Sequence, residues 1–324
     1  MRDTFAGVAL PRPPAAPDRG PADAPFHDLV EARFRRVMEA DPVTATYYGI
    51  HAFDDQLPDA TRDQVLGQLE ADRRHLALIE GLDPAAMSAS VRFDRDLEIH
   101  NLRREIFDVD VVRRWERHSS GIDAVGDALF PLLTRDFDTP IVRFEAMAAR
   151  MEAIPGHLEQ HRTRAVGPQV RLWQQREIAS GRDLPSFFEE IVEAAEALDL
   201  PESLQARVRA GTQLAESAVV EHLDWVARTL HHGIDEWHLG RERYDELVGL
   251  RGFDGLDSDA ILEIGWEQLE IQHAARADVI LRICCNRLRK PPARYRRRAA
   301  QQFPSGCSLL ARQALLAKAC SIAL

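Results

Sequence analysis

The chain has 324 residues, with 41 Lys and Arg against 52 Asp and Glu, which gives a formal net charge of −11. An acidic chain is not expected to bind nucleic acid, because phosphate binding needs clustered Lys and Arg. The sequence has no run of roughly 18 apolar residues, so we expect neither a membrane span nor a membrane partner.

The composition changes abruptly after Asp278. Residues 279–324 contain no Asp, Glu or His, yet they hold all four cysteines, both lysines and ten of the basic residues. Residues 1–278 therefore carry 31 basic and 52 acidic residues, a net charge of −21, whereas the tail carries +10. Because the body has no cysteine, it needs no oxidising compartment, and we expect a cytoplasmic protein.

The apolar pattern of most of the chain predicts helices. Residues 1–24 are rich in Pro, Ala and Asp without a period, which favours a disordered leader. After an ordered loop at 41–59, apolar residues recur at three- and four-residue spacing between Pro, Gly and Ser breaks. We expect helices at about residues 25–40, 61–80, 90–109, 122–134, 140–154, 168–180, 185–198, 201–232, 240–248 and 257–280.

The body contains no convincing period-two run of β-branched residues. We therefore predict an all-α fold in which helices pack through apolar stripes into a multi-helix bundle or array. Residues 25–280 are expected to form a helical domain, and residues 281–324 an anomalous basic tail that is poorly ordered.

His157 and His161 form the most suggestive local pattern, because histidines four residues apart on a helix share a face and can reach one zinc ion. The zincin motif needs Glu directly after the first His, however, and Leu158 stands there. Pro155-Gly156 is expected to interrupt the helix. We therefore interpret the pair as two solvated histidines at a polar helix start.

Other candidates also have structural interpretations. Glu270 and His273 form an E-x-x-H, the half-site of a di-iron carboxylate bundle, but we find no convincing second copy. His222 is expected to be a hydrogen-bonded histidine at the edge of the core. An acidic face on one helix is expected to be solvated; it comprises Glu189, Glu190, Glu193 and Glu196.

The tail offers two weak signals of its own. Cys284 and Cys285 are adjacent and do not form a C-x-x-C motif. The basic run Arg294–Arg298, which includes Tyr295, could bind RNA or anionic lipid. Because the tail is so unlike the body in composition, we assign neither function.

Five segments carry a further signal through their order and spacing. They are Asp41-Pro42 with Ala45-Thr46 and Gly49-Ile50-His51; Leu57-Pro58-Asp59; Arg150-Met151-Glu152-Ala153-Ile154-Pro155; Leu184-Pro185-Ser186-Phe187-Phe188; and Trp237-His238-Leu239-Gly240-Arg241-Glu242-Arg243-Tyr244-Asp245-Glu246-Leu247. Together they resemble the bacterial domain-of-unknown-function family 885, from about Phe26 to Asp278.

The resemblance implies the front half of a larger fold like that of the helical zinc metallopeptidases. It implies amide hydrolysis by a metal-activated water with a glutamate as general base. Zinc would be the cofactor of the full-length family, and a peptide or small amide the substrate. The family's metal motif, built around Pro-Gly-His-His, lies in the second half of a longer protein. Pro155-Gly156-His157-Leu158 is similar, but it lies in the front half and has Leu158 in place of the second His.

We therefore assign no catalytic, cofactor-binding or metal-binding residue to this chain. We expect the N-terminal helical portion of a zinc-dependent peptidase-like hydrolase that is inactive as given. A non-catalytic helical scaffold for protein interactions is the alternative, and a di-metal bundle around Glu270 and His273 is a third reading.

The composition of the tail suggests a truncated family member whose reading frame shifts after about residue 279. Sequencing the gene should reveal an insertion or deletion near the codons for residues 279–285. Another frame should then open a long downstream region that encodes the family's His and Glu motif. An intact frame without such a region would contradict the hypothesis.

Overall fold

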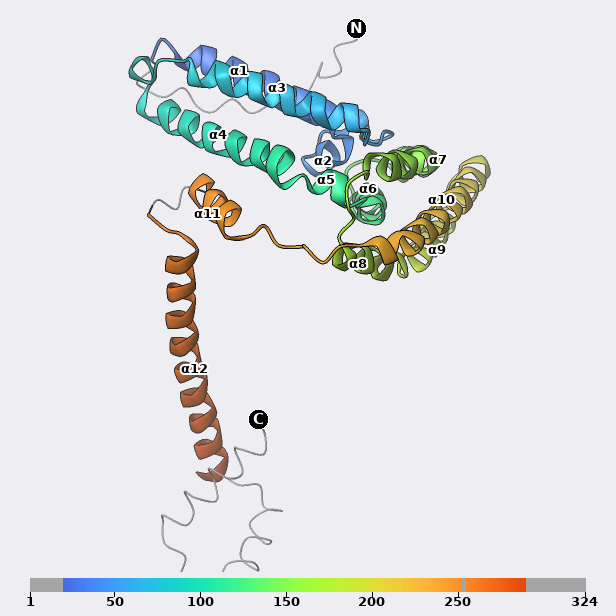
Figure 1. Ribbon diagram of the computed structural model, residues 1–324. Coiled ribbons are helices and arrows are strands. Elements are labelled where there is room, and N and C mark those ends of the chain that lie inside the picture. The colour runs from blue at the N-terminus through green and yellow to red at the C-terminus, as the bar shows by residue number, and fades with distance from the viewer. Residues whose placement is uncertain (1–19, 252–254, 290–324) are drawn as a thin grey trace, which may run out of the picture. The chain divides into compact units, whose positions relative to one another are not determined.

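The structure, a computed structural model, describes residues 20–251 and 255–289, without the side chains of residue 278 and residues 281–289. It divides the chain into two compact units, residues 1–255 and 256–324. Throughout the described ranges the regular elements are helices (Figure 1). An isolated bridge joins Val170 and Ile234. The predicted all-α fold is confirmed.

One layer of the first unit is formed by three helices that lie side by side (Figure 1). Their shared core includes the buried side chains of Phe26, Ile79 and Ile99. Thr61 caps the second of these helices along the chain, since its Oγ1 accepts a hydrogen bond from the N–H of Gln64 at 3.3 Å. The helices are α1 (Asp23–Ala40), α3 (Arg62–Glu80) and α4 (Ala89–Phe107).

The segment between α1 and α3 is more regular than the expected loop. Helix α2 (Pro42–Tyr47) and a 3₁₀ turn (His51–Phe53) occupy much of it. Asp41 caps α2 by accepting a hydrogen bond from the N–H of Thr44 at 3.0 Å, and Pro42 takes the first helical position, which it favours. An Asp-Pro pair can thus begin a short helix as well as end the preceding one.

A second layer is built around α7 and α10, which pack along each other. Their axes approach closely at Gly211, where an added Cβ would lie 3.3 Å from Cβ of Met151. The buried core of this layer includes Phe144, Leu158 and Phe188. Its helices are α6 (Gly121–Thr134), α7 (Pro140–Arg164), α8 (Arg171–Gly181), α9 (Leu184–Ala197) and α10 (Glu202–Thr229).

The expected interruption at Pro155-Gly156 is wrong, because α7 runs unbroken to Arg164. Proline inside a helix removes one backbone hydrogen bond and destabilises it by about 3 kcal/mol. Ile154 and Leu158 on either side are fully buried, and their packing outweighs that loss. As a consequence, His157 and His161 lie on the interior face of a continuous helix.

Two connections join these layers. Helix α4 ends in a π-helical turn (Asp108–Val112), which is followed by Arg113 in the left-handed region at φ 50° and by α5 (Arg114–Arg117). Trp115 Nε1 donates to the carbonyl oxygen of Val109 at 2.8 Å and holds this turn. Helix α11 (Arg241–Leu250) contacts α4.

The second unit contains α12 (Ser258–Arg289), which continues past the expected end at residue 280. Asp257 Oδ1 accepts a hydrogen bond from the N–H of Ala260 at 2.9 Å, which confirms the predicted start. Leu262, Trp266 and Leu269 share one face and are exposed. None of the described helices is both long and apolar enough to span a bilayer.

Arg150 on α7 is fully buried and ties several segments together. Its Nε donates to the carbonyl oxygen of Gln56 at 2.9 Å, and its Nη1 to that of Ala128 at 2.6 Å. Its Nη2 donates to Oγ1 of Thr46 at 2.8 Å and to the carbonyl oxygen of Pro42 at 3.2 Å. Burial lowers the pKa of Arg150 to about 10, so the guanidinium is charged at neutral pH.

Replacing Arg150 by Met should lower the free energy of unfolding by about 3–5 kcal/mol, because several buried acceptors lose their donor at once. Urea unfolding at pH 7.5 measures the loss. The matched control is Arg209→Met, which breaks an exposed ion pair with Glu196 and should change stability by less than about 1 kcal/mol. Equal effects of the two replacements would contradict the role given to Arg150.

Candidate functional site

A buried cluster of titratable side chains lies where α6, α7, α8 and α10 meet. Its centre is Glu177 on α8, whose side chain is 1% exposed. Glu177 Oε1 accepts hydrogen bonds from the N–H groups of Gly121 at 2.9 Å and Ile122 at 3.3 Å. These are the first N–H groups of α6, which have no partner within their helix, so Glu177 caps that helix from a distance.

Two histidines and a serine complete the surroundings of this carboxylate. His222 Nε2 donates to Glu177 Oε1 at 3.0 Å, Ser119 Oγ donates to Oε2, and His118 Nε2 lies 3.5 Å from Oε2. Burial acts to raise the pKa of Glu177, but the hydrogen bonds from His222 and Ser119 outweigh it and hold the pKa at about 2. Glu177 is therefore anionic.

The packing at Gly121 leaves no room for a side chain. A Cβ at this position would lie 2.8 Å from Cδ2 of Leu158 and 2.9 Å from Cε1 of His222. The start of α6 can approach Glu177 and His222 only because this residue is glycine.

His157 and His161 form the other half of the cluster, with 3.1 Å between their Nε2 atoms. Nδ1 of His161 contacts two groups: the carbonyl oxygen of Ser119, which can only accept, and Nη2 of Arg164 at 3.0 Å, which can only donate. One Nε2 of the histidine pair donates to the other, and Nδ1 of His157 has no hydrogen bond of normal geometry.

Both imidazoles are neutral at physiological pH. Burial is the main cause that lowers the pKa of His157 to about 4 and that of His161 to about 3, and the nearby Arg164 guanidinium adds to both shifts. The expectation of two solvated histidines is wrong, since their exposed fractions are only 4% and 5%. The sequence did place them on one helical face, and the structure brings them together.

The residues present do not fit the zinc ion that the family resemblance implies. A catalytic zinc site needs three protein ligands, and His157 and His161 supply two. Within the described ranges, no group of three or more His, Cys, Asp or Glu side chains could hold a metal ion. Glu270 and His273, the proposed di-iron half-site, are exposed on α12.

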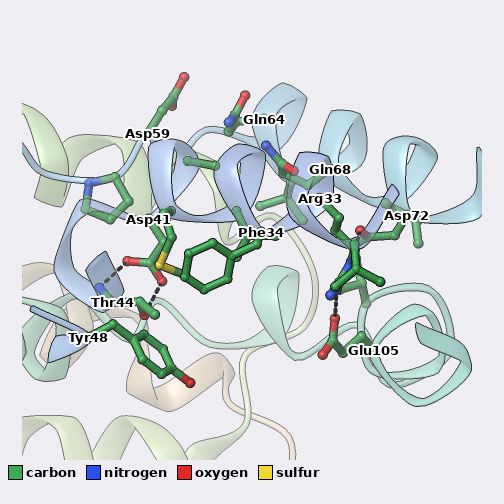
Figure 2. A pocket seen from close by; sticks show the side chains of 18 of the residues that line it. Arg33, Phe34, Asp41, Thr44, Tyr48, Asp59, Gln64, Gln68, Asp72 and Glu105 are labelled. Carbon is green, nitrogen blue, oxygen red and sulfur yellow. Dashed lines mark hydrogen bonds and ion pairs between the residues drawn. The ribbon is translucent and has the colours of Figure 1, made fainter. Parts of the chain in front are cut away.

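A pocket of about 590 Å³ lies along α1 and α3, and we call it the α1/α3 groove. Figure 2 shows Phe34 between two polar ends, one formed by Asp41 and Thr44 and the other by Arg33 and Glu105. The apolar lining of the groove includes Val30, Phe34, Val37, Met38, Val65 and Leu69. In the sequence these positions show only the helical apolar spacing that predicts packing.

The Arg33 end of the groove is an ion-pair network. Arg33 contacts Asp72 at 3.3 Å and Glu98 at 3.5 Å, and it donates to Glu105. A hydrogen bond from His75 and the charge of Arg33 lower the pKa of Glu98, although burial opposes them. The lining of the whole groove holds five carboxylates against one guanidinium, so the groove is acidic.

The remaining candidates from the sequence behave as structural residues. His222 is hydrogen-bonded as predicted, but it is fully buried rather than at the core edge. The backbone of Cys284 and Cys285 belongs to α12, and the structure does not describe their side chains. Residues Arg294–Arg298 lie outside the described residues. The predicted solvated face is confirmed, since its four glutamates are exposed: Glu189, Glu190, Glu193 and Glu196.

Two central residues of the cluster, His118 and Glu177, were missed by sequence reasoning. Glu177 follows no motif, and its partners are 45 and 55–59 residues away along the chain. His118 was hidden by its neighbours, because Ser119-Ser120-Gly121 was taken only as a helix break. The sequence signal for Glu177 was weak: it is an acidic residue in a predicted helix, α8, whose apolar stripe is poorly defined.

An all-α array with a buried carboxylate–imidazole cluster and an acidic groove thus defines the class of this protein. The sequence model of the family "Bacterial protein of unknown function (DUF885)" matches residues 42–319, and the chain belongs to that family. The matched range extends well beyond Asp278, so it does not support the expectation that the resemblance ends there. No curated protein matches the chain.

The fold also matches a solved structure of "a putative lipoprotein of unknown function from Shewanella oneidensis" with a TM-score of 0.68 and 16% sequence identity. The match covers 83% of this chain and 50% of the other, so this chain spans about half the length of that relative. At this identity the likeness shows the fold alone.

Acid should destabilise the fold through His157 and His161. Their folded-state pKa values lie below about 6.5, so the unfolded chain binds more protons between about pH 4 and 6.5. This stabilising contribution is fully present above pH 6.5 and is lost as the pH falls. The free energy of unfolding should drop by about 2–3 kcal/mol from pH 7.5 to 5.5.

Urea unfolding at the two pH values measures this drop. Replacing both His157 and His161 by Gln should remove most of it. The same double replacement at the exposed pair His231 and His232 should leave it unchanged. A drop that survives the first double replacement would assign the acid sensitivity to other groups.

Proposed function

We propose that the helical body is the substrate-binding portion of a zinc-dependent peptidase-like hydrolase and contributes none of its metal ligands. The α1/α3 groove carries this proposal, because it combines an apolar floor with charged ends in a volume of about 590 Å³. Ligand pockets are concave and mostly apolar, with a few polar groups that fix orientation. The hydrolase class itself rests on the family resemblance.

The groove favours a cationic ligand. Five carboxylates line it (those of Asp41, Asp59, Asp72, Glu98 and Glu105), and Arg33 is the opposing guanidinium. Arg36 also contacts Asp72, at 2.5 Å, so the Arg33 end is largely neutralised. Asp59 is exposed and has no cationic partner among the described ion pairs, which leaves the other end negative. We infer a peptide with alternating apolar and basic side chains.

The zinc content of the purified chain is a second property that can be tested. Since the described residues supply at most a pair of adjacent imidazole ligands, the purified chain should hold no stoichiometric zinc and should not hydrolyse peptides. Mass-spectrometric metal analysis after purification and dialysis tests the first expectation. About one tightly held zinc per chain, lost on replacing His157, would overturn it.

Groove binding can be measured by fluorescence anisotropy with a labelled peptide of alternating Leu and Lys. Binding should be saturable, and Phe34→Ala should weaken it about tenfold, because a loss of about 1.4 kcal/mol of apolar contact corresponds to that factor. The matched control is Phe93→Ala, which removes an exposed phenyl ring outside the groove and should leave the affinity unchanged.

The charge of the ligand is tested with a peptide of alternating Leu and Glu. This peptide should not bind, because its carboxylates would face those of the groove. Equal binding of the two peptides, or an affinity that is insensitive to Phe34→Ala, would contradict the proposed groove function.

The alternative is a non-catalytic scaffold for protein interactions. The exposed side chains of Leu262, Trp266 and Leu269 on α12 favour it, because apolar residues that share an exposed face often mark an interaction surface. The two functions are separable. A scaffold should lose its partner when Trp266 is replaced by Ala and keep it when Phe34 is replaced, whereas groove binding shows the opposite pattern.

A further inference from the structure

Ser120, His118 and Glu177 form a row of side chains, the relay, that the groove does not use. Ser120 Oγ lies 2.7 Å from His118 Nδ1, and His118 Nε2 lies 3.5 Å from Glu177 Oε2 without a hydrogen bond of normal geometry. Because Glu177 is anionic and buried, it favours the tautomer of His118 that carries its proton on Nε2. Nδ1 of His118 is then free to accept the hydroxyl proton of Ser120.

The backbone at Ser120 is in an unusual conformation. Its φ of 57° lies in the left-handed region, which is uncommon for a residue other than Gly and tends to occur at functional sites. Ser120 directly precedes α6, a helix of 14 residues, and is half-buried, whereas its neighbour Ser119 is 1% exposed. Of the two adjacent serines, only Ser120 reaches both a base and the surface.

We propose that Ser120 is a base-activated nucleophile that accepts acyl groups from activated esters, with His118 as its general base and Glu177 as a positioning residue. Attack forms a bond between Oγ and the ester carbonyl carbon, and the Oγ proton moves to Nδ1 of His118. The bond to the leaving alkoxide breaks, and the alkoxide takes that proton. Water then reverses the sequence and releases the acid.

The surface beside the relay indicates the substrate class. The ring of Trp173 lies 5.7 Å from that of His118, and the guanidinium of Arg114 lies 5.4 Å from the Trp173 ring centroid. Arg114 is exposed, and its guanidinium lies close enough to His118 that burial and this charge together lower the pKa of that imidazole. Esters that carry an anionic group together with an aromatic or apolar part suit this surface.

Turnover should be slow. The N–H groups of Gly121 and Ile122 would be suitable donors for an oxyanion beside Ser120, but both donate to Glu177. Removing one oxyanion donor typically lowers the rate by about a hundredfold or more. The covalent adduct on Ser120 is therefore a better readout than steady-state hydrolysis.

The experiment treats the chain of residues 1–324 with a fluorophosphonate, which phosphonylates activated serines. Intact-mass spectrometry should show a single adduct, and tandem mass spectrometry should place it on Ser120 in preference to every other serine. Ser120→Ala should abolish the adduct, and His118→Asn should slow its formation at least tenfold. The control Ser186→Ala, at an exposed serine on α9, should change nothing.

Circular dichroism of each variant shows whether it has folded. The location of the adduct on the unchanged chain is a test that does not depend on any variant folding. No adduct on wild-type Ser120, or labelling spread evenly over several serines, would overturn the proposal. So would an adduct that forms on folded His118→Asn at the wild-type rate. None of these three results depends on peptide binding in the groove.

Discussion

The arrangement of the helical layers depends on the hydrogen bonds that the guanidinium of Arg150 donates. Arg150 projects from α7, and its Nε donates to the carbonyl oxygen of Gln56. Because Gln56 lies in the irregular stretch before α3, its carbonyl has no helical N–H as a donor. Thr46, which accepts from Arg150, donates in turn to Asp54 at 2.6 Å, and Asp54 contacts His51 at 2.9 Å. One buried cation thus fixes α2 and the following turn against α7. The end of the α1/α3 groove at Asp41 and Thr44 is fixed with them.

The buried cluster around Glu177 and the α1/α3 groove both follow from how the polar groups of each layer find hydrogen-bond and ion-pair partners. In the α6–α10 layer, Glu177 caps a buried helix start, and burial lowers the pKa of the nearby His157 and His161 so that both imidazoles are neutral. In the layer formed by α1, α3 and α4, ion pairs centred on Arg33 close one end of the groove and leave its apolar floor open. The first place provides a base next to a serine, and the second provides room for a ligand.

Local signals in the sequence were sufficient for most of the fold. The ends of α3 and the start of α12 depend on neighbouring residues such as Thr61, Gly81 and Asp257, and they lie within a residue or two of the expected ranges 61–80 and 257–280. Pro155 was misjudged because the packing that keeps α7 continuous comes from distant helices. The site was predictable only as the pair His157 and His161. Glu177 and His118 meet through tertiary contacts between residues 59 positions apart, which no local spacing can indicate.

Binding of a basic, apolar peptide in the groove along α1 and α3 can be located by hydrogen–deuterium exchange with and without the Leu–Lys peptide, a measurement that assumes no reaction. Exchange should slow in residues 30–44 and 64–72 and change little in α9 and α10. Slower exchange confined to α12 or to α6 and α8, or no change at saturating peptide, would show that the peptide does not bind in the groove.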